Sequence, residues 1–178
     1  DLGYRVAKWS GGTIDDGSTD KVNHVVMLSD KNISIEFEQT KTLVVTSDPT
    51  DELGYRNLQR AFEAAQQGDT IILQTGTWTH VSPRGTWYLE GKDITLTSIA
   101  PEDPDVVANT IIDGTHLDIS DVTRDTLITG ITFANTHIGG GKIGPPRSPQ
   151  GFDGPSAWGG AIDLEDASPT IRNCVFRN

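Results

Sequence analysis

The stretch LQRAFEAAQQGDTIILQTGTW, residues 58–78, passes from a helical pattern to a strand pattern at Gly68. Its first half spaces apolar residues three or four positions apart, which is typical of an amphipathic helix. This stripe consists of Leu58, Ala61, Phe62 and Ala65. Glycine commonly ends a helix, so the helix is predicted to stop at Gly68 and a strand to follow directly. Because a helix of about three turns is marginal alone, its stripe must cover an apolar surface.

Similar strand-like sequences recur later in the chain. The four segments are GDTIILQTG from residue 68, GKDITLTSI from residue 91, RDTLITGITFAN from residue 124 and SPTIRNCVFRN from residue 168. A second set, TIIDG (residues 110–114) and AIDLED (residues 161–166), precedes the last two. Repeats of short alternating strands are typical of parallel strands stacked as a solenoid. The residues predicted to point inward are Ile71, Leu73, Ile94, Leu96, Ile111, Leu127, Ile131, Ile162, Ile171 and Val175.

These repeats resemble the start of a pectate-lyase-like parallel β-helix. The resemblance includes the segments NLQRAFEAAQQGDTIILQTGTW and GGAIDLEDASPTIRNCVF. The resemblance implies an all-β, right-handed parallel β-helix, a solenoid in which an N-terminal amphipathic helix caps the first coil. Residues 55–178 would then be the capping helix and first coils, incomplete at the C-terminus. Because an uncapped end exposes strand edges, chain–chain contact is expected there.

The first 46 residues have the alternation of half-buried strands at residues 24–28, 33–38 and 42–46. In order and spacing, GYRVAKW, DDGSTDKVNHVVML and DKNISIEFE resemble the closing part of divergent B-repeat modules of bacterial surface proteins. The resemblance implies that residues 1–46 are the C-terminal part of a small β repeat module. Residues 47–54, with Pro49 and Gly54, are predicted to be a linker.

The composition limits the partners. A formal net charge of -11 opposes binding to nucleic acid and to anionic lipid surfaces. No apolar run approaches the ~20 residues of a membrane span. Cys174 is the single cysteine, so an intrachain disulfide is excluded. The resemblances imply an extracellular or cell-surface location.

A long Gly/Pro-rich insertion, residues 137–160, must leave the strands as a loop. It carries Phe152, Asp153 and Trp158, together with Lys142 and Arg147. Aromatic faces beside carboxylates are typical of a sugar-binding cleft, so Phe152, Asp153 and Trp158 are candidate carbohydrate-binding residues. The alternative is a loop that only packs over the strands.

The segment IDLEDASP contains a second candidate site. In a strand, Asp163 and Glu165 project to one face, opposite Ile162 and Leu164. They are therefore further candidates for carbohydrate binding, and with Asp166 they could hold calcium. Calcium is the only cofactor for which the sequence offers candidate ligands. The alternative is a solvated strand face.

Two classes of function remain open. The first is a structural, adhesive or carbohydrate-binding segment that contacts a polysaccharide or a cell-envelope glycan. The second is a polysaccharide lyase or glycoside hydrolase with a groove on an outer face, for which Lys142, Arg147 and Arg172 are the nearby basic residues. In addition, Asn135 or Asn173 is predicted to occupy a left-handed turn position between parallel sheets, with its side-chain amide bonded to a neighbouring coil.

Overall fold

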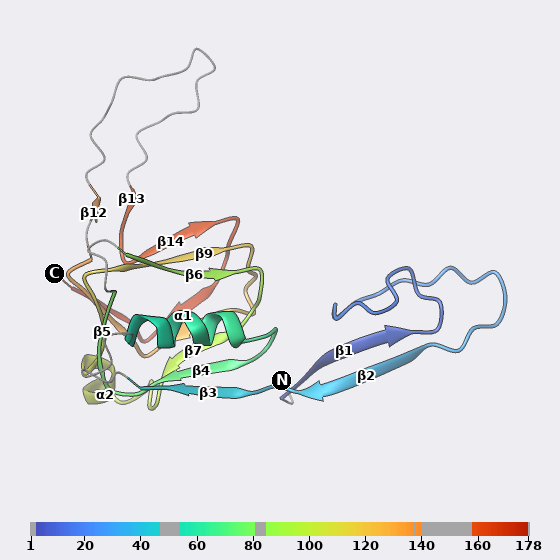
Figure 1. The fold of residues 1–178 in the computed structure, drawn as a ribbon, viewed down its shortest axis with the longest axis horizontal. Coiled ribbons are helices and arrows are strands. Elements are labelled where there is room, and N and C mark those ends of the chain that lie inside the picture. Colours follow the sequence, from blue (N-terminus) through green and yellow to red (C-terminus); the bar gives the residue numbers. More distant parts are fainter. Residues whose placement is uncertain (1–2, 47–53, 81–84, 137, 140–157, 178) are drawn as a thin grey trace, which may run out of the picture.

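The computed structural model describes residues 3–46, 54–80, 85–136, 138–139 and 158–177. The described N-terminal part is a hairpin in which β1 (Tyr4–Ser10) pairs antiparallel with β2 (Ser34–Gln39). This hairpin extends to one side of the remaining strands (Figure 1). Residues 24–28, predicted to form a strand, form none in the structure. Their backbone belongs to a loop, where Ile14 N donates to His24 O at 2.7 Å.

Most of the other described strands lie in three parallel sheets, which the chain visits in turn. The five-stranded sheet has the order β15 (Thr170–Arg172), β10 (Leu127–Thr129), β7 (Thr95–Ser98), β4 (Thr70–Leu73) and β3 (Thr42–Val45). The four-stranded sheet has the order β16 (Val175–Arg177), β11 (Thr132–Ala134), β8 (Thr110–Asp113) and β5 (Gly76–Thr79). The three-stranded sheet has the order β14 (Ile162–Glu165), β9 (His116–Ser120) and β6 (Thr86–Glu90). A short antiparallel pair joins β12 (Ile138–Gly139) to β13 (Trp158–Gly159).

The helix α1 (Gly54–Ala64) packs against β3, β5 and β6, near the start of these sheets. The predicted stripe is confirmed, because Leu58, Ala61, Phe62 and Ala65 are all buried in the common core. The helix ends at Ala64, earlier than predicted, and Gly68 follows in a turn with φ +80°. Lys92 Nζ donates to Ala65 O at 2.9 Å and so satisfies a carbonyl at the C-terminal end of the helix.

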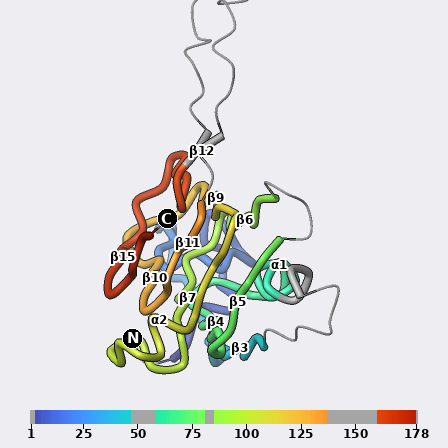
Figure 2. Tube along the Cα trace, turned by 90° about the vertical axis from the view of Figure 1, so that its left-hand side faces the viewer, coloured from blue at the N-terminus to red at the C-terminus, as the bar shows by residue number. Residues whose placement is uncertain are grey.

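All three sheets share this core. In the five-stranded sheet, Ile71, Leu96 and Ile128 lie in register and are fully buried. Figure 2 shows β4, β7, β10 and β15 following one another in chain order. Of the residues predicted to point inward, Ile71, Leu73, Ile94, Leu96 and Ile131 are buried.

The predicted inward face is wrong at three positions. Ile112 and Ile128 are buried where Ile111 and Leu127 were predicted, and Phe176 rather than Val175 stacks on buried Phe133. Since successive strand residues point to opposite faces, a shift of one position reverses the assignment. The helix α2 (Pro104–Ala108) packs against β8 on the side away from the core. Apolar side chains are therefore accommodated on both faces of β8.

The expected fold class, an all-β right-handed parallel β-helix, is corrected by the structure. The described strands fall into several short parallel sheets with few helices among them, an arrangement of α/β type and not a closed solenoid. The last strands remain open to solvent, since Leu164, Ile171 and Phe176 are exposed. In addition, β3 of the expected N-terminal module belongs to the five-stranded sheet, where it pairs with β4.

Candidate functional site

The outer face of the β6–β9–β14 sheet combines an aromatic ring with carboxylates. In β6, Trp87 and Leu89 are buried, so Tyr88 points outward and is 56% exposed. The parallel register places Tyr88 beside Asp118 of β9, and Asp118 beside Asp163 of β14. One aromatic side chain and two carboxylates therefore form a row across three strands.

A second outward row lies two residues further along the same strands. It consists of Glu90, Ser120 and Glu165, again in register. The outward residues of the three strands are called the Tyr88 face below, and they are Thr86, Tyr88, Glu90, His116, Asp118, Ser120, Asp163 and Glu165. The face thus carries four carboxylates and no lysine or arginine on its described strands.

Hydrogen bonds fix the edge of this face. Gln59 of α1 accepts from Tyr88 N at 3.1 Å and donates to Tyr88 O at 3.4 Å. The free edge of β6 is therefore bonded to the helix, which holds Tyr88 in position. At the start of β6, Thr86 Oγ1 lies 3.0 Å from His116 Nε2 of β9.

The structure places the sequence-predicted residues as follows. Asp163 and Glu165 are exposed at outward positions of β14, and Asp163 Oδ1 accepts from Leu164 N at 3.0 Å. Asp166 follows the end of β14 in a left-handed turn with φ +48°, so it is not one of the outward positions of that strand. Trp158 lies in β13, which contacts β14. Phe152, Asp153, Lys142 and Arg147 lie outside the described residues.

Tyr88, Asp118 and Glu90 were not predicted from the sequence. The signal was present in TWYLE and HLDIS, which alternate apolar and polar residues in the manner of half-buried strands. The register could not be read locally, because the paired residues are 30 residues apart between β6 and β9 and 45 residues apart between β9 and β14. Arg172, considered as a catalytic base, lies in β15 of a different sheet.

The described part of the chain contains no cluster of side chains with the geometry of a metal site. No three side chains of His, Cys, Asp or Glu gather there in a group that could hold a metal ion. Calcium binding by Asp163, Glu165 and Asp166 therefore stays a prediction from the sequence.

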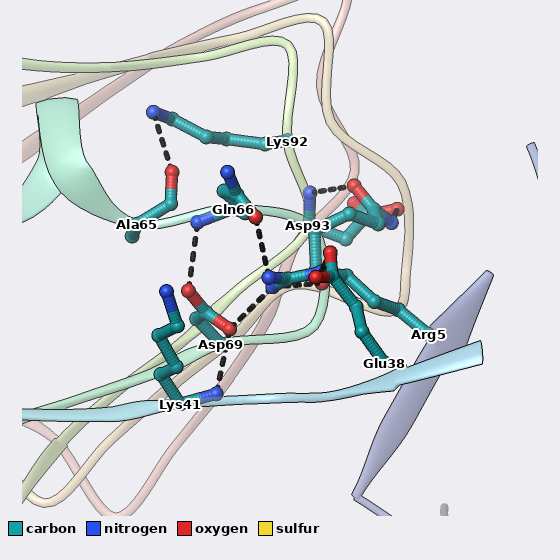
Figure 3. A network of polar contacts seen from close by, with 9 residues as sticks. Arg5, Glu38, Lys41, Ala65, Gln66, Asp69, Lys92 and Asp93 are labelled. Atoms are coloured by element: carbon teal, nitrogen blue, oxygen red, sulfur yellow. Dashed lines mark hydrogen bonds and ion pairs between the residues drawn. The ribbon is translucent and has the colours of Figure 1, made fainter. Parts of the chain in front are cut away.

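A second concave region, a cleft of about 810 Å³, lies between the hairpin and the sheets. Arg5 lines this cleft and is only 9% exposed. Figure 3 shows Arg5 beside Glu38 and Asp69. Arg5 Nε lies 2.7 Å from Glu38 Oε1 and Arg5 Nη1 lies 2.6 Å from Asp69 Oδ1. Although burial lowers the pKa of Arg5, the hydrogen bond to Glu38 and the charge of Asp69 outweigh it and raise this pKa. Arg5 is therefore a structural tie between the hairpin and the sheets.

Asp93, which also lines this cleft, accepts several hydrogen bonds. Its carboxylate accepts from Thr123 N at 2.7 Å, from Thr123 Oγ1 and Thr126 Oγ1 at 2.8 Å each, and from Gln67 Nε2 at 3.0 Å. Burial opposes the charged form, but these bonds together lower the pKa of Asp93 below its usual range. Since its lone pairs are occupied, Asp93 stabilises the fold and offers little to a ligand.

Comparison with known proteins adds no relative. No family model, no curated protein and no solved structure matches this chain. The two resemblances drawn from the sequence therefore stay predictions. Among the described residues, no helix has the length and apolar character needed to cross a membrane.

Proposed function

We propose that this chain is an extracellular or cell-surface segment that binds a polysaccharide or cell-envelope glycan through the Tyr88 face, in an adhesive or structural role. The observation that carries the proposal is the in-register row of Tyr88, Asp118 and Asp163. The location rests on the resemblance of the first 38 residues to modules of bacterial surface proteins.

The chemistry of the row suits a sugar. An exposed tyrosine ring offers an apolar face on which a sugar ring can stack, and its hydroxyl is a polar handle. Carboxylates accept hydrogen bonds from sugar hydroxyls, and charge-assisted bonds are the stronger kind. Neighbouring strands are about 4.8 Å apart, so the three side chains span a length suited to consecutive sugar rings.

A glycoside hydrolase or polysaccharide lyase is the second candidate. One strand spacing between Asp118 and Asp163 is close to the separation of about 5 Å between the two carboxyl groups of retaining glycosidases. However, hydrolysis needs the two groups to flank the scissile bond, whereas these two stand side by side on one sheet face. The arrangement therefore favours binding over cleavage.

Affinity gel electrophoresis against soluble polysaccharides of neutral, acidic and amino-bearing types tests the proposal. The intact protein is expected to be retarded by at least one of them, and Tyr88→Ala is expected to reduce the retardation. A matched control is Tyr4→Ala, which removes an equally exposed tyrosine (56%) from the hairpin.

Retardation that survives Tyr88→Ala, or that is lost equally in Tyr4→Ala, would place the binding site elsewhere. Release of reducing or unsaturated sugar ends during the run would instead favour the enzyme.

A further inference from the structure

We infer that the Tyr88 face selects glycans that carry free amino groups over neutral and acidic glycans. This inference rests on the proposed function and adds the charge class of the ligand. Glu90, Asp118, Asp163 and Glu165 all point outward from the three strands that also present Tyr88. The ring would hold a sugar of any charge class, so the carboxylates decide which class is preferred.

The carboxylates of the face have no basic partner within the described residues. The ion pairs found there join Arg5 to Glu38 and Asp69, and Lys21 to Asp125. None of them includes a residue of the Tyr88 face. His116, the only histidine on these three described strands, lies with its Nε2 3.0 Å from Thr86 Oγ1. The negative charge of the face is therefore left for solvent ions or a ligand to balance.

Two of these carboxylates are direct neighbours. Asp118 and Asp163 occupy the same register position on adjacent strands, where like charges destabilise a sheet. A ligand ammonium group bound between them would remove this repulsion and form charge-assisted hydrogen bonds. A uronate carboxylate at the same place would add a third negative charge, so an acidic glycan is disfavoured.

The second row extends the same selection. Glu165 neighbours Ser120, and Glu90 lies on the far side of Ser120, so this row alternates acid, hydroxyl, acid across the strands. A chain that crosses the strands over Tyr88 would meet Asp118 and Asp163 in its own row, and it would have Glu90 and Glu165 along one side. Thr86 and His116 lie along the other side. A polymer with one amine on each sugar ring can place its amines near both rows.

The test is calorimetric titration in a slightly acidic buffer with three oligosaccharides of equal length. They are a chitosan oligomer, which carries protonated amines, the corresponding N-acetylated oligomer, which is neutral, and an oligogalacturonate. The chitosan oligomer is expected to bind about tenfold more tightly than the N-acetylated oligomer, because several exposed ion pairs each contribute a few-fold. The oligogalacturonate is expected to bind weakest.

A double variant separates this face from the general charge of the protein. Asp118→Asn with Asp163→Asn is expected to lose most of the tenfold preference. The matched control, Asp30→Asn with Glu36→Gln, removes two exposed carboxylates of the hairpin and is expected to keep the preference. Urea unfolding of both variants confirms that each is folded before titration.

The outcomes are distinct. Equal affinity for the amine and N-acetylated oligomers, or an equal loss of preference in both double variants, overturns the inference and leaves the proposed function in place. Tighter binding of the oligogalacturonate overturns it as well. Absence of binding to all three oligomers, while the gel experiment finds no other glycan, removes the proposed function together with the inference.

Discussion

Arg5 Nη1 lies 2.6 Å from Asp69 Oδ1, although 64 residues separate the two in sequence. Asp69 is fully buried and also accepts from Lys41 N at 2.8 Å and Gln66 N at 2.9 Å. One carboxylate therefore joins the hairpin, the start of β3 and the turn after α1. This contact fixes where the hairpin meets the sheets.

Replacing Arg5 by methionine is expected to destabilise the protein by about 3–5 kcal/mol, because it leaves the buried charge of Asp69 without its partner. Urea unfolding measures the change. Lys21→Met is the control, since the exposed Lys21–Asp125 pair is expected to contribute less than about 1 kcal/mol. Similar small losses in the two variants would show that the Arg5 contact is not a structural tie.

Asp93 gives a prediction with a defined pH dependence. Its pKa is lowered in the folded state, so its contribution is complete above the unfolded carboxyl pKa of about 4 and is lost as pH falls through the lower folded value. Asp93→Asn is expected to cost about 1–3 kcal/mol near neutral pH. The difference from the wild type should shrink below about pH 4.

Chemical unfolding at several pH values measures this difference. Asp30→Asn, an exposed carboxylate of the hairpin loop, serves as the control and should show little change. A difference between Asp93→Asn and the wild type that stays constant down to pH 2 would contradict the assigned role of Asp93.

The left-handed turn predicted at Asn135 or Asn173 is found at both positions, with φ +48° at Asn135 and +50° at Asn173. Asn135 Nδ2 donates to Asp113 at 2.7 Å and Asn173 Nδ2 donates to Glu102 at 2.9 Å, so both side-chain partners are carboxylates. Asn135→Val is expected to destabilise by about 1–2 kcal/mol, because a β-branched residue tolerates this backbone poorly. Asn135→Gly should cost much less, and equal thermal stability of the two variants would rule out backbone strain as the cause.

The Tyr88 face is expected to reduce stability in the absence of ligand. Asp118→Asn with Asp163→Asn should stabilise the free protein by up to about 1 kcal/mol, because it removes like charges in register. Added salt should diminish this gain by screening. If the double variant is less stable than the wild type at low salt, the two carboxylates do not repel each other as inferred.

The sequence predicts features that depend on local periodicity. The stripe of Leu58, Ala61, Phe62 and Ala65 is set by one helix, and it is buried as predicted. The inward face of β8 and β10 could not be decided in this way, because Ile111 with Ile112, and Leu127 with Ile128, are apolar at consecutive positions. Burial against distant strands and α2 decides which residue points inward.

The candidate site was predicted in part for the same reason. The outward position of Asp163 and Glu165 follows from the alternation of one strand. Tyr88 and Asp118 join them only through the pairing of β6, β9 and β14, and the sequence gives no local sign of that register. The predicted strand at residues 24–28 is wrong because an apolar run needs a partner strand as well as apolar residues.

The most direct test of glycan binding at this face is amide chemical-shift mapping of the intact protein during titration with the oligosaccharide that binds best. The largest shifts are expected in β6, β9 and β14, around Tyr88, Asp118 and Asp163, and they should disappear in Tyr88→Ala. Shifts concentrated on the cleft around Arg5 and Asp93, with the three strands unchanged, would contradict binding at the Tyr88 face.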